Sequence, residues 1–198
     1  MSIEFYGPPA SGKTTACKAL EAQRVAARVR VRGIADALWH YTRFCARRPR
    51  AAWFLVGLYL SHRGFSRARD FYNWVVYRCA KWEKSQRGGA VILDEGLLQN
   101  MLSIPRRALT QEEVRRFLSR VPHGDGVVVF ALPRDVRRAR MRARDERERG
   151  GASSRADDAL ERNFSVSCSV LASLPGVTVV ASEEEAVRAA EEAVRGQT

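Results

Sequence analysis

The chain has 198 residues, of which 45% are hydrophobic and 28% charged, and its formal net charge is +12. This length predicts one domain with a full-sized core, and the composition excludes a largely disordered chain. The charge favours anionic partners such as phosphates, nucleotides, nucleic acid or a membrane surface. Nearly all basic residues are arginine, which is also typical of a GC-rich genome, so the charge alone does not establish nucleic-acid binding.

Membrane and secretion signals are not evident. No stretch approaches the ~20 consecutive apolar residues that span a bilayer. The segment MSIEFYG lacks the charged region, apolar run and small-residue cleavage site of a secretory signal. We therefore expect a cytoplasmic protein without a transmembrane segment.

The first predicted element is a strand at residues 2–6, which stops at a glycine. Residues 13–23 are good helix formers, so a loop joins this strand to a helix. The loop matches the pattern G-x-x-x-x-G-K-[ST] without a mismatch. Its residues are Gly7, Pro8, Pro9, Ala10, Ser11, Gly12, Lys13 and Thr14.

Such a loop binds the phosphates of a nucleotide. Its later backbone N–H groups point at the phosphates, and the helix that begins there adds the positive end of its dipole. Lys13 is expected to reach the β- and γ-phosphates, and the Thr14 hydroxyl to ligate Mg²⁺. The predicted cofactors are therefore ATP and Mg²⁺. The predicted nucleotide contacts are Gly7, Ala10, Ser11, Gly12, Lys13, Thr14 and Thr15.

A second strand is predicted at 27–32, and a long helical section follows at 34–87, which Pro49 and Gly64 break into about three pieces. Asp36, just after this strand, could bind substrate or act as a base, or could only be a charge at a helix N-terminus. The aromatic residues of this section are most often helix core. Arg43 and Arg67 are candidate contacts for an anionic acceptor.

Residues 88–95 form a predicted buried strand that delivers two adjacent acids, Asp94 and Glu95, to one point. The loop at 7–14 resembles that of P-loop proteins, and this resemblance implies that the strand lies beside the first strand, so that Asp94 would face the Mg²⁺ held by Thr14, through water. Glu95 would then point to the substrate side. It could be a general base, a substrate contact or a partner of a nearby arginine, and the residues leave these three roles open.

From residue 110 onward the predicted elements are helices that largely alternate with strands. A capping box, Thr110 with Glu113, predicts a helix at 110–120. The segments that follow are a strand at 126–133, a basic helix at 134–149, a helix at 156–173, a strand at 176–182 and a helix at 183–195. Strands that alternate with helices predict an α/β fold of three layers, α/β/α, around a five-stranded parallel sheet. We expect one domain, with its core at 1–33, 88–133 and 174–198, a helical insert at 34–87 and a lid at 134–155.

The chain resembles the P-loop kinases of the nucleotide-kinase type, which include thymidylate and adenylate kinases. The likeness rests on GPPASGKTT, on the short acidic strand end and on the late arginine-rich helix. It implies that Arg140 and Arg144 are lid arginines that neutralise charge on the γ-phosphoryl group. Two positions depart from the pattern. Ala10 stands where glycine is usual, and DEG at 94–96 stands where an acid is typically followed by arginine.

The predicted function is an ATP- and Mg²⁺-dependent kinase that phosphorylates a small polar metabolite. A hydroxyl acceptor is preferred because Glu95 could take its proton, whereas a nucleoside monophosphate is already anionic and needs no base. The alternatives are a nucleoside monophosphate kinase, a non-kinase P-loop ATPase or nucleotide-binding switch, and a polynucleotide-end kinase. Nucleic acid is a possible but not a favoured partner.

Overall fold

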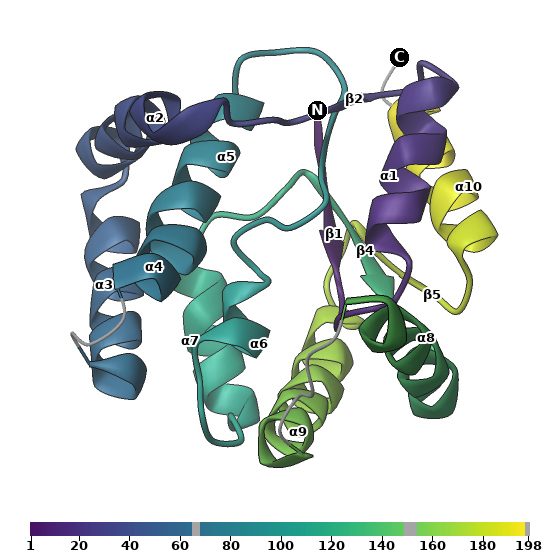
Figure 1. The fold of residues 1–198 in the computed structure, drawn as a ribbon. Coiled ribbons are helices and arrows are strands. Elements are labelled where there is room, and N and C mark those ends of the chain that lie inside the picture. The colour runs from purple at the N-terminus through teal and green to yellow at the C-terminus, as the bar shows by residue number, and fades with distance from the viewer. Residues whose placement is uncertain (65–67, 149–153, 197–198) are drawn as a thin grey trace.

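The centre of the fold is a sheet of five parallel strands in the spatial order β2-β3-β1-β4-β5 (Figure 1). A computed structural model describes residues 1–64, 68–148 and 154–196, without the side chains of 144–157. The strands are β1 (Ser2–Tyr6), β2 (Ala27–Arg28), β3 (Val91–Leu93), β4 (Gly126–Phe130) and β5 (Val177–Val180). The predicted parallel α/β sheet is therefore confirmed.

Helices cover both faces of the sheet, which gives the predicted three layers (Figure 1). They are α1 (Lys13–Ala22), α2 (Gly33–Arg47), α3 (Pro49–Arg63), α4 (Ala68–Phe71), the π-helical turn η1 (Tyr72–Val76), α5 (Tyr77–Ser85), α6 (Asn100–Ser103), α7 (Gln111–Arg120), α8 (Arg134–Glu148), α9 (Ser154–Leu171) and α10 (Glu183–Arg195). No helix of the described ranges is long and apolar enough to cross a bilayer.

The alternation of side chains along the strands divides the core in two. Ile3 and Phe5 of β1 pack in the cluster that contains α1 and α10. Tyr6 packs on the other face, in the larger cluster with the helices of the 34–87 section, α7 and α9. Glu4 has the same parity as Tyr6, so its side chain enters the core on the side of the larger cluster.

Four predicted strands are shorter than expected. β4 has five residues where eight were predicted, and β5 has four where seven were predicted. β2 has two residues where six were predicted, and β3 has three where eight were predicted. β2 is an edge strand with a single neighbour, and edge strands of natural proteins are commonly short. In the 34–87 section, Pro49 begins α3 and Gly64 ends it with a φ of +65°, so both predicted breaks are confirmed. The division into core, insert and lid stays a prediction.

The capping box of α7 gives a test of the fold. The Thr110 hydroxyl accepts a hydrogen bond from the Glu113 N–H, and the Glu113 carboxylate accepts one from the Thr110 N–H. Thr110→Ala should lower the free energy of unfolding by about 1 kcal/mol in urea titration, because a first-turn N–H loses its partner. Ser119→Ala, near the other end of α7, should change it by less than about 0.5 kcal/mol. Equal effects of the two changes would contradict a capping role.

Candidate active site

The predicted phosphate loop joins β1 to α1 and is built on left-handed backbone. Ala10 has a φ of +58° and Gly12 a φ of +94°. A non-glycine residue in this region costs roughly 1–2 kcal/mol, which explains why glycine is usual at position 10 in the kinases that the sequence resembles. At Gly12 a Cβ atom would also collide with the side chain of Glu183, so only glycine fits there.

Glu183 brings a third segment to the loop. It is the first residue of α10, and its carboxylate pairs with the guanidinium of Arg140 on α8, at 2.5 Å. Arg140, one of the two expected lid arginines, is therefore held beside the phosphate loop. Arg144 also belongs to α8, but its side chain lies outside the described part of the chain.

Lys13 lies inside the curve of the loop. Its ammonium donates hydrogen bonds to the carbonyl oxygens of Gly7 (2.7 Å) and Pro8 (2.8 Å). Only 6% of the residue is exposed. Burial lowers the pKa of Lys13 to about 8, while the negative charge of Glu95 acts to raise it. Thr14 and Thr15 follow on the first turn of α1, and both are exposed.

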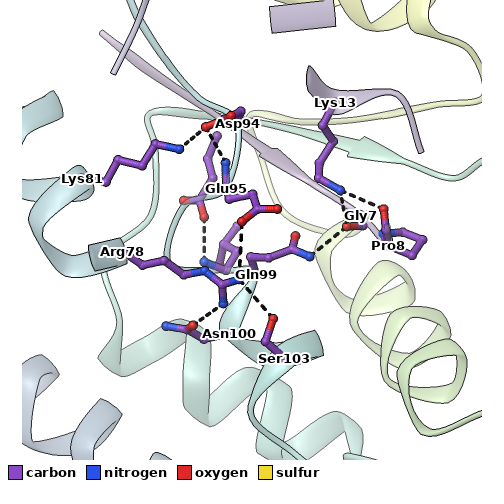
Figure 2. Close-up of polar contacts among 12 residues, drawn as sticks. Gly7, Pro8, Lys13, Arg78, Lys81, Asp94, Glu95, Gln99, Asn100 and Ser103 are labelled. Atoms are coloured by element: carbon purple, nitrogen blue, oxygen red, sulfur yellow. Dashed lines mark hydrogen bonds and ion pairs between the residues drawn. The ribbon is translucent and has the colours of Figure 1, made fainter. Parts of the chain in front are cut away.

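Asp94 is locked between two cations. It follows β3, which pairs directly with β1, so the expected position of the acidic strand is confirmed. One carboxylate oxygen accepts a hydrogen bond from Lys81 of α5 and the other from Arg28 of β2 (Figure 2 shows the Lys81 contact). Burial acts to raise the pKa of Asp94, but Lys81 and Arg28 outweigh it, so this pKa lies below its ordinary value.

These contacts bear on the predicted Mg²⁺ site. Both oxygens of Asp94 are engaged, and Thr14 is exposed at the start of α1. The described ranges contain no group of three or more His, Cys, Asp or Glu that could hold a metal ion. Mg²⁺ commonly keeps several waters and takes its other ligands from substrate phosphates and one or two protein groups. The residues fit an ion of this kind, with Thr14 as a direct ligand and Asp94 reached through water.

Glu95 differs from its neighbour, because 57% of its side chain is exposed. Its carboxylate lies 3.7 Å from the Arg78 guanidinium and projects between Arg78 and Lys13 (Figure 2). That this side of the loop faces a substrate stays a prediction. With one long ion pair, Glu95 can exchange its partner at little cost, whereas Asp94 cannot.

Arg78 and Lys81 were not predicted. They lie three residues apart on one side of α5 and are 5% and 4% exposed. Arg78 donates hydrogen bonds to Asn100 Oδ1 (2.6 Å) and Ser103 Oγ (3.1 Å). The sequence feature that could have predicted them is the presence of two cations in an apolar, aromatic helical segment. A cation that is buried in such a segment requires an acidic or polar partner.

Gln99 links this side of the site to the phosphate loop. Its side-chain amide donates a hydrogen bond to the Gly7 carbonyl oxygen, at 3.0 Å (Figure 2). Its Oε1 atom is buried and has no hydrogen-bond partner within the described ranges. The bond to Gly7 fixes which end of the amide is the oxygen, so Oε1 is a hydrogen-bond acceptor held at the site.

Two other predicted substrate residues, Asp36 and Arg43, contact residues within or just before the 34–87 section. Asp36 accepts hydrogen bonds from Lys84 Nζ (2.6 Å) and from the Arg32 N–H (2.7 Å). The Arg32 N–H and Lys84 hold the pKa of Asp36 below its ordinary value. The Arg43 guanidinium lies 3.6 Å from Glu83. These contacts match the role of a helix-terminal charge for Asp36. Arg67 lies outside the described residues.

Glu4 is a buried acid beneath the loop that follows Asp94. It is 0% exposed, and its carboxylate accepts hydrogen bonds from the N–H groups of Leu98 (2.6 Å) and Gly124 (3.3 Å). A Cβ atom at Gly96 would collide with this carboxylate. The glycine of DEG, one of the two departures from the kinase pattern, therefore makes room for Glu4.

Comparison with known proteins shows the fold. No protein-family profile matches the sequence, and no curated protein is similar to it. Three structures of deoxyadenosine kinase from M. mycoides are similar, each over 100% of this chain and 98% of that chain. The structure with dCMP and a flexible dCDP has a TM-score of 0.57 at 13% identity, the one with dATP 0.56 at 13%, and the one with dCTP 0.53 at 12%. At this identity the likeness shows that the chain shares the fold of these structures.

The ionisation of Glu4 gives a pH test. Burial raises its pKa from 4.5 to about 7, although the N–H groups of Leu98 and Gly124 act to lower it. Between these two pH values the unfolded chain has released this proton and the folded chain still holds it. Stability should therefore fall by up to roughly 3 kcal/mol as pH rises from 4.5 to 7.

Unfolding free energies at a series of pH values would measure this effect. Glu4→Gln should remove the decline that belongs to Glu4, so the difference between the wild-type and variant curves should change across this window. Glu112→Gln, at an exposed position of α7, should leave the wild-type profile intact. Parallel curves for the wild type and Glu4→Gln would show that Glu4 does not titrate in this range.

Proposed function

We propose that this chain is an ATP- and Mg²⁺-dependent kinase that transfers the γ-phosphoryl group to a hydroxyl group of a small polar metabolite. The main support is the arrangement at the carboxyl edge of the sheet, where Lys13 of the phosphate loop and the exposed carboxylate of Glu95 lie on either side of one space (Figure 2). A phosphate donor and a proton acceptor are the two parts that such a transfer needs.

The donor side follows from the loop. The N–H groups at the start of α1 and the Lys13 ammonium would bind the β- and γ-phosphates, with Lys13 leaving the carbonyl oxygens of Gly7 and Pro8 to do so. Mg²⁺ would supply neutralisation of phosphate charge, held by Thr14 and, through water, by Asp94. Arg140 lies beside the loop and would add a further positive charge as the transfer proceeds.

The acceptor side favours a hydroxyl over a phosphate. Its buried cations already have partners, since Arg28 and Lys81 bind Asp94 and Arg78 binds Asn100 and Ser103. The groups that remain there, the Glu95 carboxylate and Gln99 Oε1, accept hydrogen bonds. They suit a substrate group that donates one, and they would repel a second phosphate. Glu95 would take the hydroxyl proton as a general base.

Nucleosides are the first acceptors to test, because the similar solved structures are described as deoxyadenosine kinase. A screen with labelled ATP should also include sugars, amino alcohols and nucleoside monophosphates. Acceptor-dependent transfer of label to a hydroxyl compound supports the proposal. Release of phosphate at the same rate with every acceptor would instead support the ATPase class.

The phosphate loop gives one variant test. Lys13→Met should reduce kcat/KM for ATP by about 10²-fold or more, because the γ-phosphate loses a buried cationic donor. Calorimetry with Mg²⁺ and ATP should show weakened binding as well. Lys18→Met, which removes an exposed lysine from the same helix, should bind ATP like the wild type. Unchanged ATP binding by Lys13→Met would contradict the assignment of the donor site.

The candidate general base Glu95 gives a second variant test. Glu95→Gln should lower kcat about 10²-fold or more on a hydroxyl acceptor, with KM for ATP little changed, because the amide cannot take the proton. Asp36→Asn should keep near wild-type kcat, since the contacts of Asp36 are to Lys84 and to the Arg32 backbone. Full turnover by Glu95→Gln would leave a substrate contact or an arginine pair as its role.

A further inference from the structure

A second basic surface, here named the arginine groove, lies between the α2–α3 turn and the end of α7. It consists of two adjoining hollows that share Arg50 and Arg120, with volumes of about 530 and 820 Å³. Arg47 and Arg48 line the first hollow, and Trp53 lines the second. Neither hollow is lined by an aspartate or a glutamate, so the groove is strongly positive.

The groove is separate from the candidate active site. It includes the residues after α7, which lead into the first residue of β4, Gly126. The start of β4 lies at the amino edge of the parallel sheet. The phosphate loop and Asp94 follow the ends of β1 and β3, so they lie at the opposite, carboxyl edge. A ligand in the groove would therefore be additional to one on the phosphate loop.

The guanidinium groups of the groove are set for an anion. Arg48 stacks on the Trp82 ring, 4.5 Å from its centroid, and Arg120 on the Phe54 ring, at 5.4 Å. Stacking restricts the orientation of a guanidinium and leaves its N–H edges able to donate hydrogen bonds to an anion. Arg50 has no hydrogen-bond or ion-pair partner in the described ranges. Arg47 differs, because it pairs with Glu83 at 2.9 Å.

The backbone adds to this positive field. α3 begins at Pro49, between the arginines, and no side chain caps its first turn. Proline has no N–H, so the N–H groups of Arg50 and Ala51 are the ones without a helical partner there. A helix of this length also carries a partial positive charge at its N-terminus. Phosphate oxygens are the acceptors that such a combination of N–H groups binds best.

Trp53 adds an exposed aromatic surface to the arginine groove. It is 75% exposed and lies three residues after Arg50, on the same side of α3. An exposed tryptophan next to these arginines provides a flat surface on which a nucleobase can stack, with its phosphate within reach of the arginines. A phosphate without an aromatic ring would leave Trp53 unused, and an apolar ligand would leave the arginines unneutralised.

We propose that the arginine groove is a second binding site for a nucleotide, with its phosphate on Arg48, Arg50 and Arg120 and its base on Trp53. The nucleotide can come from two sources, as a free nucleotide or as part of a single-stranded nucleic acid, because both present a base joined to a phosphate. Nucleotide binding in the groove does not require that the chain has the proposed kinase activity.

Calorimetry on the full chain tests the proposal in two arms, with ATP and with a ten-residue oligothymidylate. The double variant Arg50→Glu/Arg120→Glu should lose the second binding event in the ATP arm, the binding of the oligonucleotide, or both. Trp53→Ala should weaken the same event roughly 5- to 100-fold, the range expected for one stacked base. Because Trp53 is exposed, this variant also tests the site if the double variant is unstable.

The control is Arg115→Glu/Arg188→Glu, which removes two exposed arginines of α7 and α10 and changes the net charge equally. This control should retain the second event, and Lys13→Met should retain it while losing the first. If the double variant loses binding in the ATP arm alone, the groove is a site for a free nucleotide. If it loses oligonucleotide binding that depends steeply on salt, the groove is a site for single-stranded nucleic acid. A single ATP site without oligonucleotide binding, or equal loss in the control, would overturn the proposal.

Discussion

The arrangement of the candidate active site depends on the ion cluster around Asp94. This carboxylate ends β3 and is bound by Arg28 of the edge strand β2 and by Lys81 of α5. Removing one member of such a buried cluster typically costs about 3–5 kcal/mol, because the remaining charges lose their compensation. The cluster therefore fixes a strand and a helix from distant parts of the sequence at the end of β3, next to the phosphate loop.

The adjacent acids of this loop have different environments because of their neighbours. Successive side chains at a strand end point in different directions. Asp94 is bound by Lys81 and Arg28, whereas the Glu95 carboxylate lies 3.7 Å from Arg78 and 57% of its side chain is exposed. Beneath them the Glu4 carboxylate accepts a hydrogen bond from the Leu98 N–H, and a Cβ atom at position 96 would collide with this carboxylate. The Asp94 carboxylate is thereby held in ion pairs, and the Glu95 carboxylate is largely exposed.

The features predicted correctly from the sequence are those that local patterns determine. The loop that joins β1 to α1, the two helix breaks at Pro49 and Gly64 and the capping box of α7 each depend on a few consecutive residues, whereas phosphate binding by this loop stays a prediction. Arg78, Lys81 and Glu4 were missed because their roles depend on partners 13 to 120 positions away. Glu4 was hidden by the alternation of SIEFY, in which a polar residue is normally taken to face solvent, although both faces of this sheet are covered.

The net charge of +12 did not identify a partner because it combines two populations of cations. At the carboxyl edge, Arg28, Arg78 and Lys81 are compensated by acids or amides, so they stabilise the site and contribute little attraction for a ligand. In the arginine groove the lining contains no acid, and Arg50 has no partner in the described ranges. Attraction for anions depends on uncompensated charge, so the distribution of ion-pair partners, and not the net charge, indicates the surface that we propose for a second anionic ligand.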